Sequence, residues 1–476
     1  MTMRVMLIWP SGDPEINILL DRLHNEGHRI AYWVGEHPVA HLVPRGCIFH
    51  DHYDAWDAKR AESLRDAEIP PASPALIESM IASESLILTM MNKRYDRAPV
   101  DERKHVYYTM LAYWDHVLEM VKPDVVIYNT VPHSIYSNIV YELAKKRGIH
   151  TLTFEETWVG GRLMFYRDFW KGSDGFREAL KNIRKNNVEL SELHPELREY
   201  YERQTGRESQ RSPWYMHRQR SVGAGFGLWA HRARIAFRAP HLIFSRAFGL
   251  LVRSLRADLR SEYEALVQRA EVSRPFVYFP LNFQPERTTS PQGGIFHDQI
   301  LAVETLAAAL PEGWEILVKE HPSQWWLRGK TRFSSARYSG YYARLAGIPN
   351  VKLVPIHTDT FALTDNAKVV ATITGTAGWE ALLRGKYALV FGIPWYRDCP
   401  GVLQVRTVEE CKKALALVQK NQTVPATDVL SFLKVLGQEG TRAYLVSAPN
   451  AQPGIPLEES MRAIAGRLIR ELSTLS

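Results

Sequence analysis

The segment EILVKEHPSQ, residues 315–324, places three ionisable side chains at the carboxyl end of an apolar run. In parallel α/β sheets, ligands bind outside the carboxyl ends of the strands, where the amino termini of helices present free N–H groups. Lys319 and His321 are two residues apart, so an extended strand would put both on one face, where they could neutralise a phosphate. His321 could equally be a hydrogen-bonded histidine that only ends the strand. Glu320 would point the opposite way and could tie down a neighbouring loop.

A second pattern suited to anions is TITGTAGWEALLRG, residues 372–385, in which an apolar run passes through a turn into a helical sequence. Small residues at such a turn let a phosphate approach the backbone, and threonine hydroxyls can add hydrogen bonds. The donor-binding candidates here are Thr374, Gly375, Thr376, Gly378 and Glu380. Glu380 lies one turn after Thr376 and could reach a ribose hydroxyl or complete a helix-capping pattern. The segment is neither a Walker loop nor G-x-G-x-x-G, so alone it could be a simple helix cap.

Residues 279–299, FPLNFQPERTTSPQGGIFHDQ, leave an apolar run and continue for about twenty residues without a clear periodic pattern. Irregular segments of this length in compact domains are usually functional loops, although an exposed connection is the alternative. Gln284 is the donor-binding candidate, and Glu286 and Arg287 belong to the same loop.

In the first part of the chain, TLTFEETWVGGR, residues 151–162, ends a strand pattern on two carboxylates. Adjacent residues of a strand point to opposite faces, so only one of Glu155 and Glu156 is expected to face a cleft. That carboxylate is a candidate base or nucleophile. The segment after the first strand supplies the acceptor-binding candidates Ser11, Gly12 and Asp13.

The elements that must position these residues alternate between strand and helix patterns in two parts of the chain. Residues 1–170 predict a first Rossmann-like domain for the acceptor, and residues 274–424 predict a second for a nucleotide sugar. Residues 171–273 read as a helical, basic and aromatic insert, and residues 425–476 as helices that pack back towards the first domain. The expected fold is α/β: GT-B, with two Rossmann-like domains facing across a cleft.

Within this outline, strands are expected over residues 4–10, 29–35, 124–129, 150–156, 275–281, 314–322, 350–356, 368–375 and 387–395. In the second domain, helices are expected at about 298–309, 376–385 and 407–419.

Composition and charge narrow the class of protein. The 476 residues are 45% hydrophobic and 23% charged, as in an average globular fold, and no apolar run reaches the ~18 residues that would cross a bilayer. The short apolar start and the three cysteines predict a cytoplasmic protein. Residues 49–57 carry metal-capable side chains with no zinc or calcium spacing, and no D-x-D sequence occurs, so no metal is expected.

Much of the net charge of +7 gathers between residues 207 and 260, where arginine and histidine alternate with aromatic and aliphatic residues. This segment could form helices packed across the domains, or contact the inner face of the inner membrane peripherally. It could also bind nucleic acid, but no accompanying motif favours that partner.

Three of these segments together resemble the bacterial capsule polysaccharide biosynthesis family: YFPLNFQPE, KEHP and TITGTAGWEALLRGKYALVFGIPWY. The best understood members are Kdo transferases of the GT-B type that use a CMP-activated sugar. The resemblance covers roughly residues 275–405 and is weaker over the first domain. It implies that the H-P motif and the following Thr-Gly turn hold the CMP phosphate and ribose. The residues so implied are His321, Pro322, Thr374, Gly375 and Thr376.

Family members also carry an acidic pair followed by glycine, E-D-G, at the end of a first-domain strand. The corresponding residues here are Glu155, Glu156 and Thr157. In the retaining Kdo transferases the second acid is implicated as the nucleophile, which by resemblance places that role on Glu156. Glutamate replaces aspartate and threonine replaces glycine in this chain, so the reach and the turn differ from the family pattern.

The expected activity is the transfer of an acidic sugar, Kdo or another ulosonic acid, from a CMP-sugar to a surface glycan or glycolipid, with neither cofactor nor metal. His321 and Lys319 would stabilise the departing CMP. Two alternatives stay open. One is a UDP-sugar transferase or non-hydrolysing epimerase on the same fold, and the other is a non-catalytic glycan-assembly protein at the inner membrane.

Overall fold

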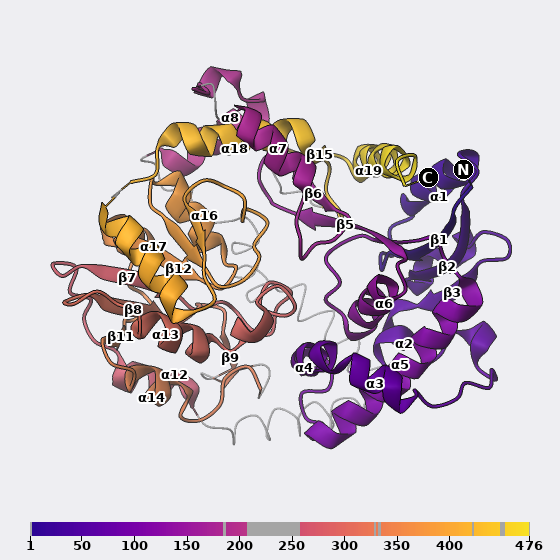
Figure 1. Ribbon diagram of the computed structural model, residues 1–476, viewed down its shortest axis with the longest axis horizontal. Coiled ribbons are helices and arrows are strands. Elements are labelled where there is room, and N and C mark those ends of the chain that lie inside the picture. The colour runs from indigo at the N-terminus through magenta and orange to yellow at the C-terminus, as the bar shows by residue number, and fades with distance from the viewer. Residues whose placement is uncertain are drawn as a thin grey trace, which may run out of the picture.

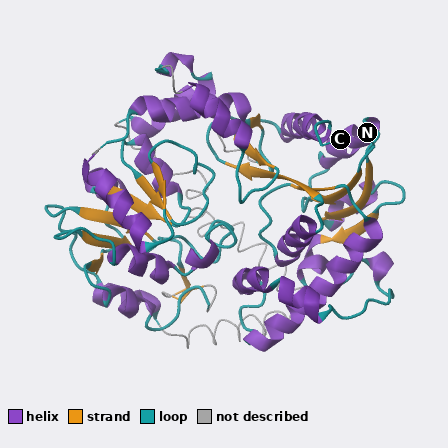
Figure 2. Ribbon diagram, in the orientation of Figure 1, coloured by secondary structure: helices purple, strands orange, loops and turns teal. Residues whose placement is uncertain are grey.

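The computed structural model describes residues 2–183, 187–206, 258–327, 330–331, 335–420, 423–447 and 453–475. The chain forms two α/β lobes, each built on a central sheet with helices on both faces (Figure 1, Figure 2). The first lobe contains the amino-terminal residues, and the second begins near residue 259.

The sheet of the first lobe has seven strands in the order β15-β6-β5-β4-β1-β2-β3. Its parallel strands are β1 (Arg4–Ile8), β2 (Arg29–Gly35), β3 (Ile48–Asp51), β4 (Val125–Tyr128) and β5 (His150–Glu156). The antiparallel edge consists of β6 (Arg162–Tyr166) and β15 (Thr441–Arg442). β15, from the C-terminal part of the chain, therefore completes the sheet of the first lobe.

Alternate side chains of β1 enter two different cores, because successive residues of a strand point to opposite faces. Val5 and Leu7 pack with α1 (Ile16–Asn25) and the C-terminal helix α19 (Leu457–Leu472). Met6 and Ile8 face the other core, which includes α4 (Ile81–Met90), α5 (Val100–Val121) and α6 (Ile135–Lys146). The short helices on this side are α2 (His52–Trp56), α3 (Pro74–Ser79) and η3 (Met91–Lys93).

The sheet of the second lobe has six parallel strands in the order β11-β8-β7-β12-β13-β14. They are β7 (Phe276–Pro280), β8 (Glu315–Lys319), β11 (Val351–Leu353), β12 (Val369–Thr372), β13 (Ala388–Val390) and β14 (Val402–Gln404). A separate hairpin pairs β9 (Trp325–Leu327) with β10 (Lys330–Thr331).

Both faces of this second sheet are buried. Val277 and Phe279 face the core that includes α12 (Leu259–Leu266), α13 (Gln299–Ala307), α14 (Tyr341–Ala346) and α17 (Val408–Lys420). Phe276 and Tyr278 face the opposite core, to which α15 (Thr360–Asn366) and α16 (Thr376–Leu383) contribute. The near-continuous apolar strands of the sequence agree with this burial on two sides.

Helices join the two lobes. α18 (Ala426–Glu439) packs on α7 (Asp174–Ile183), and α8 (Pro195–Thr205) contacts α16, where Trp379 Nε1 donates to the Tyr200 hydroxyl at 3.0 Å. Helices α7, α8 and α18 lie together at the top of Figure 1. The guanidinium of Arg397, in the second lobe, donates to Phe169 O at 2.7 Å in the first.

The predicted α/β class and its two sheets are confirmed, and every predicted strand and second-domain helix is present within a few residues of its predicted ends. Strands β3, β6, β9, β10, β14 and β15 were not predicted. The described residues of the expected insert form α7, α8, α12 and the short η4 (Leu190–Glu192). Residues 207–257, nearly all of the basic segment, lie outside the described residues. No helix in the described part of the chain is long and apolar enough to cross a membrane.

Candidate functional site

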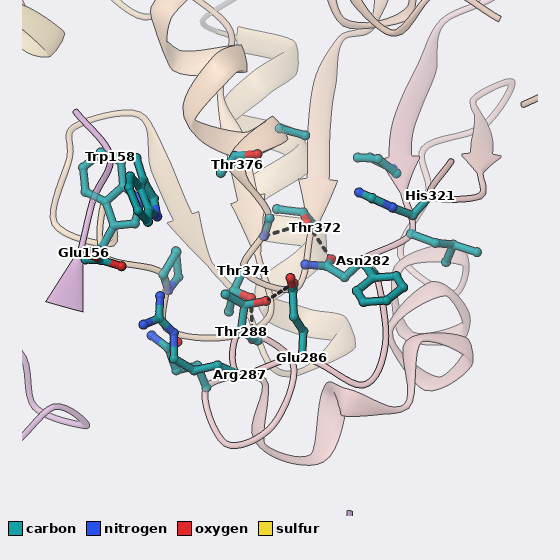
Figure 3. A pocket seen from close by; sticks show the side chains of 18 of the residues that line it. Glu156, Trp158, Asn282, Glu286, Arg287, Thr288, His321, Thr372, Thr374 and Thr376 are labelled. Atoms are coloured by element: carbon teal, nitrogen blue, oxygen red, sulfur yellow. Dashed lines mark hydrogen bonds between the residues drawn. The ribbon is translucent and has the colours of Figure 1, made fainter. Parts of the chain in front are cut away.

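A pocket of about 370 Å³ lies between the carboxyl ends of the two sheets and is lined by residues of both lobes (Figure 3). The second lobe contributes the segments after β7, β8 and β12, and the first lobe contributes the end of β5. This is the position at which parallel sheets bind ligands.

His321 lines the pocket directly after β8. Its Nδ1 accepts a hydrogen bond from the Ser323 backbone N–H at 3.1 Å, and burial lowers the pKa of its imidazole. The ring is therefore neutral near pH 7 and carries its proton on Nε2. His321 can offer a ligand one N–H donor, whereas the sequence predicted a positive charge.

The amino terminus of α16 forms the adjacent wall. Gly375 caps the helix, and a Cβ at this position would lie 2.8 Å from Thr372 Oγ1, so only glycine fits. The Gly375 N–H donates to that hydroxyl at 3.1 Å, and the hydroxyl donates to Asn282 Oδ1 at 3.1 Å. The exposed Thr376 begins the helix and also lines the pocket. The positive end of the helix dipole and the Thr376 hydroxyl suit an anion.

Thr374 lines the same wall, but its hydroxyl already donates to the carbonyl oxygen of Thr288. Three other donor-binding candidates lie outside the pocket lining. Gly378 packs against the hydroxyl of Tyr396, which explains the absence of a side chain there. Glu380 is partly buried, and burial raises its pKa to about 7. Pro322 is exposed.

Lys319 and Gln284 also lie outside the pocket lining. The Lys319 ammonium donates to Thr358 O at 2.6 Å and to Thr360 Oγ1 at 2.7 Å, and burial lowers its pKa to about 8. The same-face argument fails because β8 ends at Lys319, and His321 belongs to the turn that follows. The Gln284 side chain is held inside the lobe, where its amide donates to His297 O at 2.6 Å.

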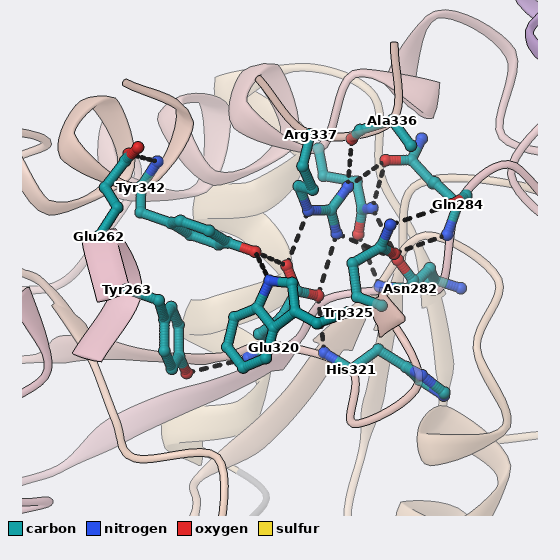
Figure 4. A network of polar contacts seen from close by, with 12 residues as sticks. Glu262, Tyr263, Asn282, Gln284, Glu320, His321, Trp325, Ala336, Arg337 and Tyr342 are labelled. Carbon is teal, nitrogen blue, oxygen red and sulfur yellow. Dashed lines mark hydrogen bonds and ion pairs between the residues drawn. The ribbon is translucent and has the colours of Figure 1, made fainter. Parts of the chain in front are cut away.

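Glu320 has the structural role expected for it (Figure 4). Its carboxylate accepts from Arg337 Nε at 2.7 Å, from Arg337 Nη2 at 3.1 Å and from the Tyr342 hydroxyl at 2.5 Å. The side chains of Glu320 and Arg337 are both fully buried. Arg337 also donates to Gln284 Oε1 at 2.7 Å, so one buried ion pair fixes residues 335–337 and the start of the 279–299 loop.

The first lobe contributes two carboxylates to the pocket. Glu156, the last residue of β5, accepts one hydrogen bond, from the Leu445 backbone N–H at 3.2 Å. Burial raises the pKa of its carboxyl, and the Arg287 charge and this N–H oppose the rise. Glu155 is buried and accepts from Gln292 Nε2 at 2.6 Å. Both residues line the pocket, so the expectation that only one would do so is wrong. β5 ends at the pocket, and its last two residues border the pocket from opposite faces of the strand.

Arg287 connects the two sides of the pocket. It belongs to the predicted functional loop of the second lobe, and its Nη1 donates to Thr130 Oγ1 of the first lobe at 2.6 Å. Its charge lies close enough to Glu156 to lower the pKa of that carboxyl. The sequence placed Arg287 in the loop but did not select it, because periodicity does not tell which side chain of an irregular loop points inward. Figure 3 shows Glu156 and Arg287 at one side and His321 at the other.

The acceptor-binding candidates Ser11, Gly12 and Asp13 form a turn outside this pocket. Ser11 Oγ donates to Asp13 Oδ2 at 2.9 Å, and a Cβ on Gly12 would lie 3.2 Å from Glu36 Oε2. These contacts explain the turn as local structure. Among the described residues, no three His, Cys, Asp or Glu side chains come together as a metal site.

Two Rossmann-like lobes with a pocket between the carboxyl edges of their sheets define a protein of the GT-B class. Residues 271–429 match the model of the family described as "Capsule polysaccharide biosynthesis protein", which confirms the family resemblance over the second lobe. His321, the α16 turn and Arg287 all lie within the matched residues.

No curated protein matches the chain. Among solved structures, KpsC of Thermosulfurimonas dismutans, a "beta Kdo 2,7 transferase", is 10% identical over 74% of this chain and 88% of its own, with a TM-score of 0.34. The UDP-GlcNAc 2-epimerase of Methanocaldococcus jannaschii is 11% identical over 100% of both chains, with a TM-score of 0.26.

Proposed function

We propose that this protein is a glycosyltransferase of capsule polysaccharide biosynthesis that transfers an acidic sugar, Kdo or another ulosonic acid, from a CMP-sugar to a glycan or glycolipid. The family match over residues 271–429 supports the biosynthetic role. The observation that carries the proposal is the pocket itself, which combines an anion-binding wall in one lobe with the carboxylate of Glu156 in the other.

The donor phosphate would lie at the amino terminus of α16, where the Thr376 hydroxyl, backbone N–H groups of the first helical turn and His321 Nε2–H would donate to its negative charge. When the bond between the anomeric carbon and the phosphate oxygen breaks, its electron pair leaves with CMP. Donors fixed in place before the reaction stabilise this charge as it develops. Neutral His321 can take this role because its Nδ1 accepts from the Ser323 N–H, which leaves Nε2–H as a hydrogen-bond donor.

Glu156 would act on the sugar side of the same bond. It either attacks the anomeric carbon, in a double displacement, or accepts the proton of the acceptor hydroxyl. Both roles require the ionised carboxylate, which burial disfavours and Arg287 favours. The contact between Arg287 and Thr130 holds this positive charge at the junction of the lobes.

Calorimetric titration with CMP, CDP and UDP tests the donor class. We expect CMP to bind most tightly, and His321→Ala to weaken its affinity by roughly 10- to 100-fold, because one hydrogen bond to a charged group is lost. His357→Ala, which changes an exposed histidine of the same lobe outside the pocket lining, is the matched control. Tighter binding of UDP would favour the UDP-sugar transferase or epimerase. If no nucleotide binds, the transferase proposal is wrong and a glycan-assembly role takes its place.

A further inference from the structure

Trp158, two residues after Glu156, has an unusual backbone conformation. Its φ is +58°, in the left-handed region that a bulky L-residue rarely adopts. The adjacent Thr157 fixes this turn, since its Oγ1 donates to Arg162 O at 2.7 Å and accepts from the Val159 N–H at 3.1 Å. Such conformations persist where the surrounding structure enforces them, and they gather at ligand sites.

The indole ring of Trp158 is held in place at the pocket. It stacks on the ring of Tyr444 with centroids 5.8 Å apart and an angle of 27° between the planes. It is partly exposed and lines the pocket next to Glu156, as Figure 3 shows. Pro394 and Trp395 of the second lobe also line this pocket, so its surface includes apolar rings from both lobes.

One short segment positions both the ring and the carboxylate. Tyr444 supports Trp158, and the next residue, Leu445, donates its N–H to Glu156. The Tyr444 N–H donates in turn to Ser460 Oγ at 3.1 Å. The distance between the ring and the carboxylate is therefore fixed by two consecutive residues of a segment paired with the first sheet.

We propose that Trp158 is an acceptor-binding residue, whose indole ring stacks against a pyranose ring of the acceptor glycan. One face of a pyranose carries C–H groups and is apolar, so it packs on an aromatic ring while the hydroxyls point sideways. A hydroxyl at the rim of such a ring would lie near the Glu156 carboxylate. The inference rests on the proposed transferase function. It assigns Trp158 to the acceptor and not to the nucleotide, because the wall suited to phosphate belongs to the other lobe.

Saturation-transfer difference NMR with methyl β-D-galactopyranoside tests this stacking, with the acyclic polyol sorbitol as the ligand control. We expect the wild-type protein to saturate the ring C–H protons of the pyranoside and to leave sorbitol nearly unaffected. Trp158→Gly should weaken the effect roughly fivefold or more, and Trp158→Phe should retain most of it, because phenylalanine keeps an aromatic face. Glycine adopts the left-handed backbone readily, which offsets part of the stacking on Tyr444 that Trp158→Gly loses, so the thermal unfolding temperature of the variant should stay close to that of the wild type.

The outcomes separate this inference from the donor assignment. Equal saturation by wild type and Trp158→Gly, or no saturation by the wild type, would overturn the stacking role and leave the CMP titration untouched. Loss of CMP affinity in Trp158→Gly would mean that the ring contacts the nucleotide, which also overturns it. Saturation that depends on Trp158 in a protein that binds no CMP would sustain a glycan site and reject the transferase.

Discussion

Glu156 and Glu320 occupy similar positions in the two lobes and differ in almost every contact. Each lies at the carboxyl end of a parallel strand, beside the pocket. Glu320 has a buried arginine, a tyrosine hydroxyl and a backbone N–H as partners. Glu156 has one backbone N–H, and the nearby Arg287 bonds to Thr130 instead.

On the proposed function, this difference separates the structural carboxylate of Glu320 from the reactive carboxylate of Glu156. A buried carboxylate whose lone pairs are all engaged is held in one position, and it can hold a loop in place. A carboxylate with unused acceptor capacity can take a proton or attack a carbon. The residue type alone does not distinguish the two roles.

The largest expected effect follows from Glu156→Gln. Without an ionised carboxylate, we expect the turnover of a CMP-sugar to fall by about 10²- to 10⁴-fold, measured as the initial rate of CMP release. The thermal unfolding temperature should change little, because the group has a single hydrogen bond to lose. A variant that keeps its turnover would remove Glu156 from the mechanism.

Arg337→Met tests the structural member of the comparison. It leaves Glu320 buried without its ion pair, so we expect a loss of about 3–5 kcal/mol in the unfolding free energy, measured in denaturant. Arg344→Met, an exposed arginine in the same region, is the control and should change stability by about 0.5 kcal/mol or less. Similar losses of unfolding free energy in both variants would contradict the structural role of the ion pair between Arg337 and Glu320.

Arg287→Met should change the pH dependence of turnover. Burial raises the pKa of Glu156 and Arg287 lowers it, so removing the charge should raise the pKa further. Because the ionised form is required, the acid limb of the pH–rate profile should move to higher pH, with the largest loss of rate at acidic pH. Thr130→Val breaks the contact between the lobes but keeps the charge, so its acid limb should stay near that of the wild type. An unmoved limb in Arg287→Met would mean that Arg287 does not control Glu156.

The smallest effect is expected for Lys319→Met. The ammonium bonds to the loop at residues 358–360 and not to the pocket, so CMP affinity should change by about twofold or less, since no ligand hydrogen bond is lost. A decrease as large as that of His321→Ala would restore the phosphate-binding role that the sequence suggested.

Sequence periodicity predicted the sheets well because their strands are buried on both faces and read as apolar runs. One strand that escaped prediction depends on a distant partner. β15 contains two residues and exists only because β6 offers it an edge, nearly 280 positions earlier in the chain. No local pattern marks such a strand.

The candidate site was predicted in outline and less well in detail. His321 and the α16 turn were found because they follow strands, and topology fixes the place of such residues. Lys319 and Gln284 were misplaced because strand alternation was extended into a turn and a loop, where it no longer applies. Trp158 was not selected, although a tryptophan between a carboxylate pair and two glycines is a signal that could have been used.

The segment from Thr441 to Leu445 is synthesised late, after the groups of the pocket that it holds in position. Both sheets apart from β15, and every residue that lines the pocket, are encoded before residue 405. The N–H that holds Glu156 and the ring that supports Trp158 come from residues about 290 positions later than the groups they position. On the proposed function, a nascent chain would therefore have its nucleotide-binding wall long before its carboxylate is fixed, and donor cleavage would begin only after translation has passed Leu445.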